Sequence, residues 1–143
     1  MSNSLITPFM SITLGATIIS IVTIASGGVF LLRVVTGSHE TNGLQKSFFR
    51  AGHAHAGVLV MLGVVLSVLG NAVGANPGWA NSGAIAVLLA AILMPAGFFL
   101  SVLGRDPARP NRMIASVWLG ATLLISGVLT SGVATLLAGI DRI

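Results

Sequence analysis

Four long apolar stretches divide the chain, and polar or charged residues separate them. They run from about residue 9 to 32, from 54 to 74, from 82 to 103 and from 113 to 140. An α-helix of roughly 20 residues, rising about 1.5 Å per residue, crosses the ~30 Å hydrocarbon core of a bilayer. Backbone groups in lipid must be hydrogen-bonded within their own segment, which favours helices. The pattern therefore predicts an all-α integral membrane protein, a four-transmembrane-helix bundle in one domain over residues 1–143.

The composition supports a lipid environment. Hydrophobic residues make up 55% of the chain and charged residues 7%, against roughly 25% charged in an average soluble domain. The seven Lys/Arg and the three Asp/Glu all lie outside the apolar stretches, so the spans face membrane lipids. Because the basic residues are scattered through connections, we expect no nucleic-acid partner.

The basic residues also predict an orientation. Arg33, Lys46 and Arg50 lie in the first connection, Arg105, Arg109 and Arg112 in the third, and Arg142 in the C-terminal tail. Cytoplasmic loops carry an excess of Lys and Arg. We therefore expect a multi-pass protein of the cell membrane, with loops 33–53 and 104–112 cytoplasmic and both termini outside.

Two features of the connections suggest interfacial anchors. The segment from Leu44 to Arg50 has the composition of a short interfacial helix leading into the second span, with Arg50 reaching the headgroups. Residues 75–81 read as a tight turn, because Pro77 and Gly78 interrupt helices and Trp79 stands where aromatic belt residues lie.

The most conspicuous polar cluster is the segment RAGHAHAG, residues 50–57, at the start of the second span. Histidines at a membrane boundary are candidate ligands for haem iron or a divalent metal. Residues that are two positions apart on a regular helix are rotated by about 200° about its axis, however, so His53 and His55 would point to opposite faces. A metal site would need a non-helical entry at Gly52 and His39 as a third ligand.

A haem b site is an alternative that uses His53 or His55 as an axial ligand. The other spans contain no histidine, so the second ligand would be Met61, Met94 or Met113. Methionine in an apolar span usually fills gaps in packing. The prediction is therefore no cofactor, with the imidazoles hydrogen-bonded at the interface or in contact with neighbouring helices.

Small residues predict where helices approach one another closely, because helix association in lipid depends on van der Waals packing. The candidate positions for contact with other helices or with a partner are Gly52, Gly57, Gly63, Gly70, Gly74 and Gly127. Pro95 interrupts the backbone hydrogen bonds of the third span, and we expect a kink there that could line a pocket.

The spans lack the intramembrane Asp, Glu, Lys or Arg that pumps, carriers and voltage sensors use. No convincing catalytic constellation is present either, so we expect a protein that is not an enzyme. Three functions remain open. The first is a non-catalytic accessory subunit of a larger membrane complex, the second a haem- or metal-binding redox or sensor protein using His53 and His55, and the third an oligomeric small-molecule channel.

The segment from Phe48 to Leu59, FFRAGHAHAGVL, resembles a motif of small uncharacterised four-span membrane proteins of actinobacteria. The small size and plain spans of the chain also resemble the accessory subunits of actinobacterial respiratory supercomplexes. This second resemblance is one of architecture. It implies that the partners are other integral membrane subunits, respiratory cytochromes among them.

Overall fold

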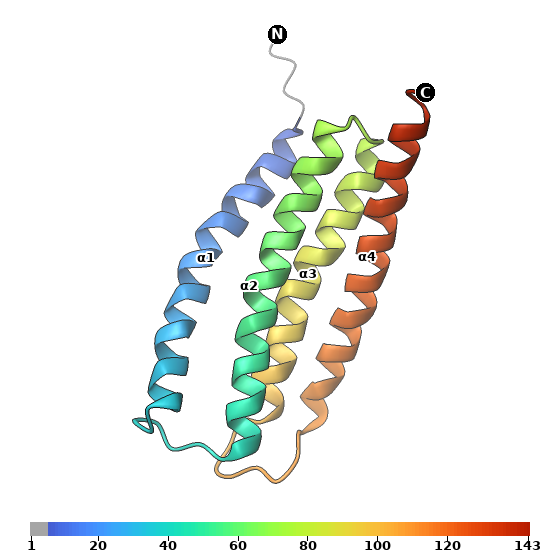
Figure 1. Cartoon of the computed structure of the whole chain (residues 1–143). Helices are drawn as coiled ribbons and strands as arrows, with labels where there is room; N and C mark the ends of the chain where they lie inside the picture. The colour runs from blue at the N-terminus through green and yellow to red at the C-terminus, as the bar shows by residue number, and fades with distance from the viewer. Residues whose placement is uncertain (1–5) are drawn as a thin grey trace.

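Four long helices form an antiparallel bundle in the computed structural model, which describes residues 6–143 (Figure 1). The helices are α1 (Pro8–Val35), α2 (Gly43–Ala72), α3 (Pro77–Ser101) and α4 (Ala115–Ile140), and a short 3₁₀ helix, η1 (Arg112–Ile114), precedes α4. All four are long and apolar enough to cross a membrane. The prediction of a four-helix membrane bundle is therefore confirmed.

The α1–α2 and α3–α4 connections lie at one end of the bundle (Figure 1). The first connection is shorter than the expected loop 33–53, because Arg33 belongs to α1 and Lys46 and Arg50 belong to α2. The start of α1, the α2–α3 turn and the end of α4 lie at the opposite end (Figure 1). This arrangement follows from an even number of spans joined by short connections. It separates six of the seven Lys/Arg from Arg142 along the long axis of the molecule.

The capping residues show where α2 and α3 begin, and both helices begin earlier than the sequence predicts. Asn42 and Gln45 form a capping box at the start of α2, which satisfies backbone N–H groups that have no partner within the helix. The segment from Leu44 to Arg50 is consequently the first part of a continuous α2, and the separate interfacial helix expected there is not formed. The α2–α3 turn is also shorter than expected, because Asn76 caps α3 and Pro77 begins it.

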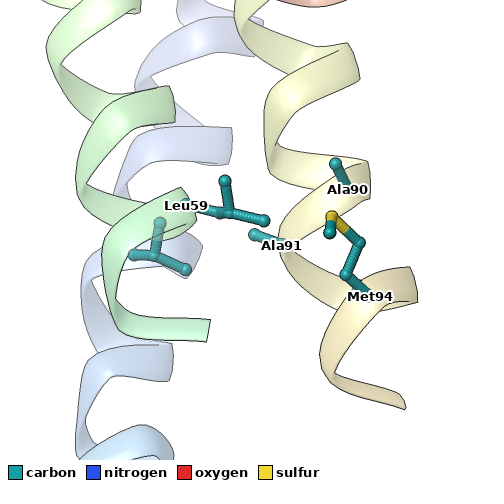
Figure 2. Close-up of a cluster of buried hydrophobic side chains, with 5 residues drawn as sticks. Leu59, Ala90, Ala91 and Met94 are labelled. Atoms are coloured by element: carbon teal, nitrogen blue, oxygen red, sulfur yellow. The ribbon is translucent and has the colours of Figure 1, made fainter. Parts of the chain in front are cut away.

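Helix α3 lies at the centre of the packing. Half of the residues in its most apolar stretch are buried inside the bundle, against 6% for α1. One core cluster joins α2 to α3 through Leu59, Ala90, Ala91 and Met94 (Figure 2). Pro95 is buried next to this cluster within α3, and the helix continues past it to Ser101.

The contact between α3 and α4 depends on glycine. A methyl carbon built on Gly127 of α4 would lie 2.7 Å from the carbonyl oxygen of Gly83, and one built on Gly97 of α3 would lie 2.7 Å from the backbone nitrogen of Val117. These backbones therefore approach more closely than any larger residue allows. The hydroxyl of Ser116 donates a hydrogen bond of 2.8 Å to the carbonyl oxygen of Leu93, which joins the two helices near the basic end.

Helix α1 is attached to the other helices near its two ends. Near its start, Met10 and Leu14 pack with Ala84 of α3. Near its end, Val34 packs with Phe49 and Val102. Between these clusters, residues 12–20 of α1 border an apolar groove of about 390 Å³ whose other wall is α3.

Candidate functional site

The histidine motif lies on regular helix, because residues 50–57 all belong to α2. His53 faces α1. Its Nδ1 would lie 3.4 Å from a methyl carbon built on Gly27, and its Nε2 would lie 3.7 Å from one built on Gly28. These are ordinary contact distances, so the imidazole packs beside the backbone of α1 with room for a methyl group between them.

His55 faces α3. Its Nδ1 lies 2.8 Å from the carbonyl oxygen of Ala51, one turn earlier in the same helix. Its ring lies 5.0 Å from the ring of Phe98, measured between centroids. The two histidines of the motif therefore contact different helices, as the angular separation of their positions on α2 requires.

His39 lies apart from both, on the exposed first connection, where its ring packs edge-on against Phe30 at 5.5 Å. The structure therefore does not bring His39, His53 and His55 together. Across residues 6–143 it contains no group of three or more His, Cys, Asp or Glu side chains that could hold a metal ion. The non-helical entry at Gly52 that a shared site would require is not formed, because α2 is continuous there.

The methionines considered as second haem ligands have different surroundings. Met94 is buried in the α2–α3 core cluster and packs against Gly120 of α4. Met61 and Met113 are largely exposed on the outside of the bundle. In this geometry Met94 fills space in the core, as methionine does in apolar interiors.

Aromatic side chains form a layer around the histidine motif that the sequence analysis did not identify. The Phe49 and Phe99 rings stack at 5.3 Å, and Phe30 of α1 packs edge-on against Phe49 at 5.3 Å. Phe48 packs edge-on against Phe98 at 5.7 Å. The sequence feature that could have predicted this layer is the pair of Phe-Phe dipeptides, one near the start of α2 and one near the end of α3. Two antiparallel neighbouring helices bring these ends together.

Gly52 makes room for this layer. A methyl carbon built on it would lie 2.8 Å from Cε2 of Phe99 and 3.2 Å from Cβ of Phe98. Real Cβ atoms do not approach other atoms this closely. Gly52 is therefore the position at which α2 and the end of α3 come into contact.

The other expected contact glycines divide into three kinds. Gly63 lies against Leu88, Gly70 against Ala80 and Gly127 against Gly83, all contacts within the chain. Gly57 has nothing within 4 Å of the place where a Cβ would stand. Gly74 is not part of the second span, which ends at Ala72; it lies in the α2–α3 turn with φ +63°, a conformation that glycine adopts without strain.

The two expected anchors lie at opposite ends of the bundle. Arg50 is exposed on the first part of α2, at the basic end. Trp79 is 60% exposed on the first turn of α3, at the other end. The role of both side chains as interfacial anchors stays a prediction.

Arg142 has a contact that the sequence did not reveal. Its guanidinium group donates a hydrogen bond to the carbonyl oxygen of Val73, the residue that caps the C-terminal end of α2. The last carbonyl groups of a helix lack partners and carry partial negative charge, so a cation is favourable there. The only basic residue at this end therefore ties the C-terminal tail to the α2–α3 turn.

Comparison with known proteins identifies no relative: no family model matches the chain, and no curated protein or solved structure matches it either. The resemblance of residues 48–59 to the actinobacterial four-span proteins therefore stays a prediction.

Proposed function

We propose that the chain is a non-catalytic structural subunit that packs, within the membrane, against helices of a larger membrane-protein complex. The observation that carries this proposal is a set of helical glycines with nothing within 4 Å. Past the first residue of each helix they are Gly15, Gly57, Gly132 and Gly139, where no atom of residues 6–143 lies within 4 Å of a Cβ built on the glycine. Glycine in a helix interior costs about 0.5–1 kcal/mol relative to alanine. In lipid this cost is offset where a glycine lets another helix approach closely.

The outward face of α4 supports the proposal most directly. Gly132 and Gly139 are seven residues apart, which is close to two helical turns, so they share one face of α4. Both are exposed. The other two glycines of α4, Gly120 and Gly127, lie on a second face, rotated by roughly 100–140° from the first, and they contact α3. The helix therefore carries small residues on two faces and uses one of them within this chain.

Replacement of Gly132 by Leu tests the proposal. Because Gly132 touches nothing in the chain, the isolated protein should unfold as the parent does. Recovery of the partner subunits in mild detergent, measured by quantitative mass spectrometry, should fall strongly. Val133→Leu, an exposed change on the same helix, is the control and should leave recovery intact. Equal recovery for Gly132→Leu and the parent would contradict the proposal.

The resemblance to accessory subunits points to a respiratory assembly as the larger complex. Cytochrome subunits are then expected among the proteins whose recovery depends on Gly132. The histidines provide a second arm of the test. Exchange of His53 and His55 for Gln keeps hydrogen-bonding capacity and removes most affinity for metal, so a structural subunit should still assemble. Stoichiometric metal or haem absorbance that is lost with this double exchange would favour a redox or sensor protein instead.

We propose further that the basic end faces the cytoplasm, in the orientation that the distribution of Lys and Arg favours. The chain contains no cysteine, so single cysteines are clean reporters. A membrane-impermeant maleimide added to intact cells should label Arg142→Cys and leave Ser38→Cys, at an exposed position of the first connection, unlabelled. Labelling of Ser38→Cys from outside would reverse the assignment.

A further inference from the structure

A polar cavity of about 590 Å³ lies at the basic end, between the first and third connections. Its walls include Glu40, Thr41, Asn42, Gln45, Arg105 and Asp106. The histidine motif contributes nothing to these walls. The cavity opens where α2 begins and α3 ends, beyond the most apolar parts of both helices.

Hydrogen bonds between residues far apart in the sequence hold the two walls together. The side-chain amide of Asn42 donates to Oδ1 of Asp106 at 2.8 Å and to the carbonyl oxygen of Pro107 at 2.9 Å. The buried amide of Gln45 donates to the carbonyl oxygens of Val102 and Gly104 at 3.0 and 3.1 Å. The cavity is therefore a preformed part of the fold, and a ligand would meet walls that are already in place.

These bonds use the donors of Asn42 and Gln45 and leave other groups for a ligand. Glu40 contributes a carboxylate, Arg105 a guanidinium, and Asp106 the oxygen that does not accept from Asn42. Oγ1 of Thr41 is buried and has no hydrogen-bond partner among the described residues. The walls thus offer acceptors for a cation and a donor for an anion, and a zwitterion matches this pair of charges.

We propose that this cavity binds the headgroup of an amino-phospholipid, phosphatidylethanolamine. Its phosphate would meet Arg105, whose guanidinium forms bidentate hydrogen bonds with phosphate oxygens, and its ammonium would meet Glu40 and Asp106. The inference does not rest on the proposed role as a subunit, because an isolated chain would bind the lipid equally well.

Headgroup chemistry distinguishes this lipid from its neighbours in a bilayer. A primary ammonium donates hydrogen bonds to two carboxylates. The trimethylammonium of phosphatidylcholine has no N–H to donate, and phosphatidylglycerol has no cation and would bring an anion next to Glu40 and Asp106. The cavity should therefore rank the three lipids with phosphatidylethanolamine first.

Native mass spectrometry of the full chain in mild detergent tests this ranking, with each of the three lipids added at equal concentration. We expect the parent to favour phosphatidylethanolamine, and the double variant Glu40→Gln/Asp106→Asn to lose roughly a hundredfold in affinity for it, the change expected for the loss of two charge-assisted hydrogen bonds. Asn at position 106 keeps an acceptor for Asn42 and tolerates the positive φ of that residue, 51°.

Arg105→Gln should weaken the binding of all three lipids, because each contains a phosphate. Arg109→Gln, in the same connection and outside the lining of the cavity, should change nothing. The unfolding midpoint of each variant shows that the fold is retained. Equal affinity of the parent for the three lipids would overturn the proposal, and so would an unchanged preference in the double variant.

Discussion

The two sides of the bundle are built from equally apolar helices and pack in different ways. Helix α4 lies against α3 at glycine positions, where backbone meets backbone. Helix α1 meets its neighbours near its ends and at a few points between them, at Ile24 and at the Gly27–Gly28 pair, and it borders an apolar groove. Mean hydropathy in their most apolar stretches is 2.2 for α1 and 2.0 for the segment containing α4. Hydropathy therefore places both helices in the membrane and does not determine how tightly either one packs.

The register of small residues accounts for the difference. Gly120 and Gly127 of α4 are seven residues apart and face α3, which contributes Gly83 and Gly97 in return. Helix α1 contributes the adjacent pair Gly27 and Gly28 to one point, where His53 fills the space. A repeat of small residues on both partners makes a continuous contact, whereas a single pair makes a local one.

The largest effect is expected where two backbones meet. Gly127→Leu would force a side chain against the carbonyl oxygen of Gly83 and the side chain of Val87. Overpacking typically costs 1–3 kcal/mol, and rigid backbone cannot yield as side chains do, so we expect a loss of about 3 kcal/mol or more. The free energy of unfolding in mixed micelles measures it. Gly132→Leu on the open face of α4 should leave the isolated chain unchanged, and similar losses for both variants would refute the comparison.

How much of this architecture the sequence predicts depends on the range of the interaction. The four spans and the placement of both basic connections at one end follow from hydropathy and chain connectivity, which are local properties. Gly63, Gly70 and Gly127 were identified as contact positions from their spacing, but their partners were not, because a partner depends on how helices rotate about their axes. Gly83 and Gly97, which complete the α3–α4 contact, were missed for the same reason.

A smaller effect is expected at the α2–α3 contact, because only one atom there lies within 3.5 Å of a carbon added at Gly70, against three at Gly127. A methyl carbon built on Gly70 would lie 2.8 Å from Cβ of Ala80. Gly70→Leu should therefore lower the free energy of unfolding by about 1–3 kcal/mol. Gly57→Leu is the matched control on the same helix, because nothing lies within 4 Å of that position. A loss confined to Gly57→Leu would show that α2 is rotated relative to the arrangement described here.

The candidate site shows the same division between local and long-range information. The opposite directions of His53 and His55 follow from helix geometry. That Gly27 and Gly28 receive His53, and that Phe98 receives His55, depends on which helices are neighbours. The cavity between the two basic connections is less predictable still, because Asn42 and Asp106 are joined across 64 residues.

The smallest change, the addition of a single methyl group, gives the sharpest test. It should lower the free energy of unfolding on the α4 side of the bundle and should not lower it on the α1 side. A Cβ at Gly120 of α4 would lie 2.5 Å from Cγ and 3.0 Å from the backbone nitrogen of Met94. Gly120→Ala should therefore cost about 1 kcal/mol or more.

A Cβ at Gly27 of α1 would lie at an ordinary contact distance of 3.4 Å from His53. Since alanine is favoured over glycine within a helix by about 0.5–1 kcal/mol, Gly27→Ala should leave the free energy of unfolding unchanged or raise it slightly. Both variants can be measured in the same micelles beside the parent. If Gly27→Ala destabilises the protein as much as Gly120→Ala does, α1 lies closer to α2 than the structure shows, and the distinction between the two sides of the bundle fails.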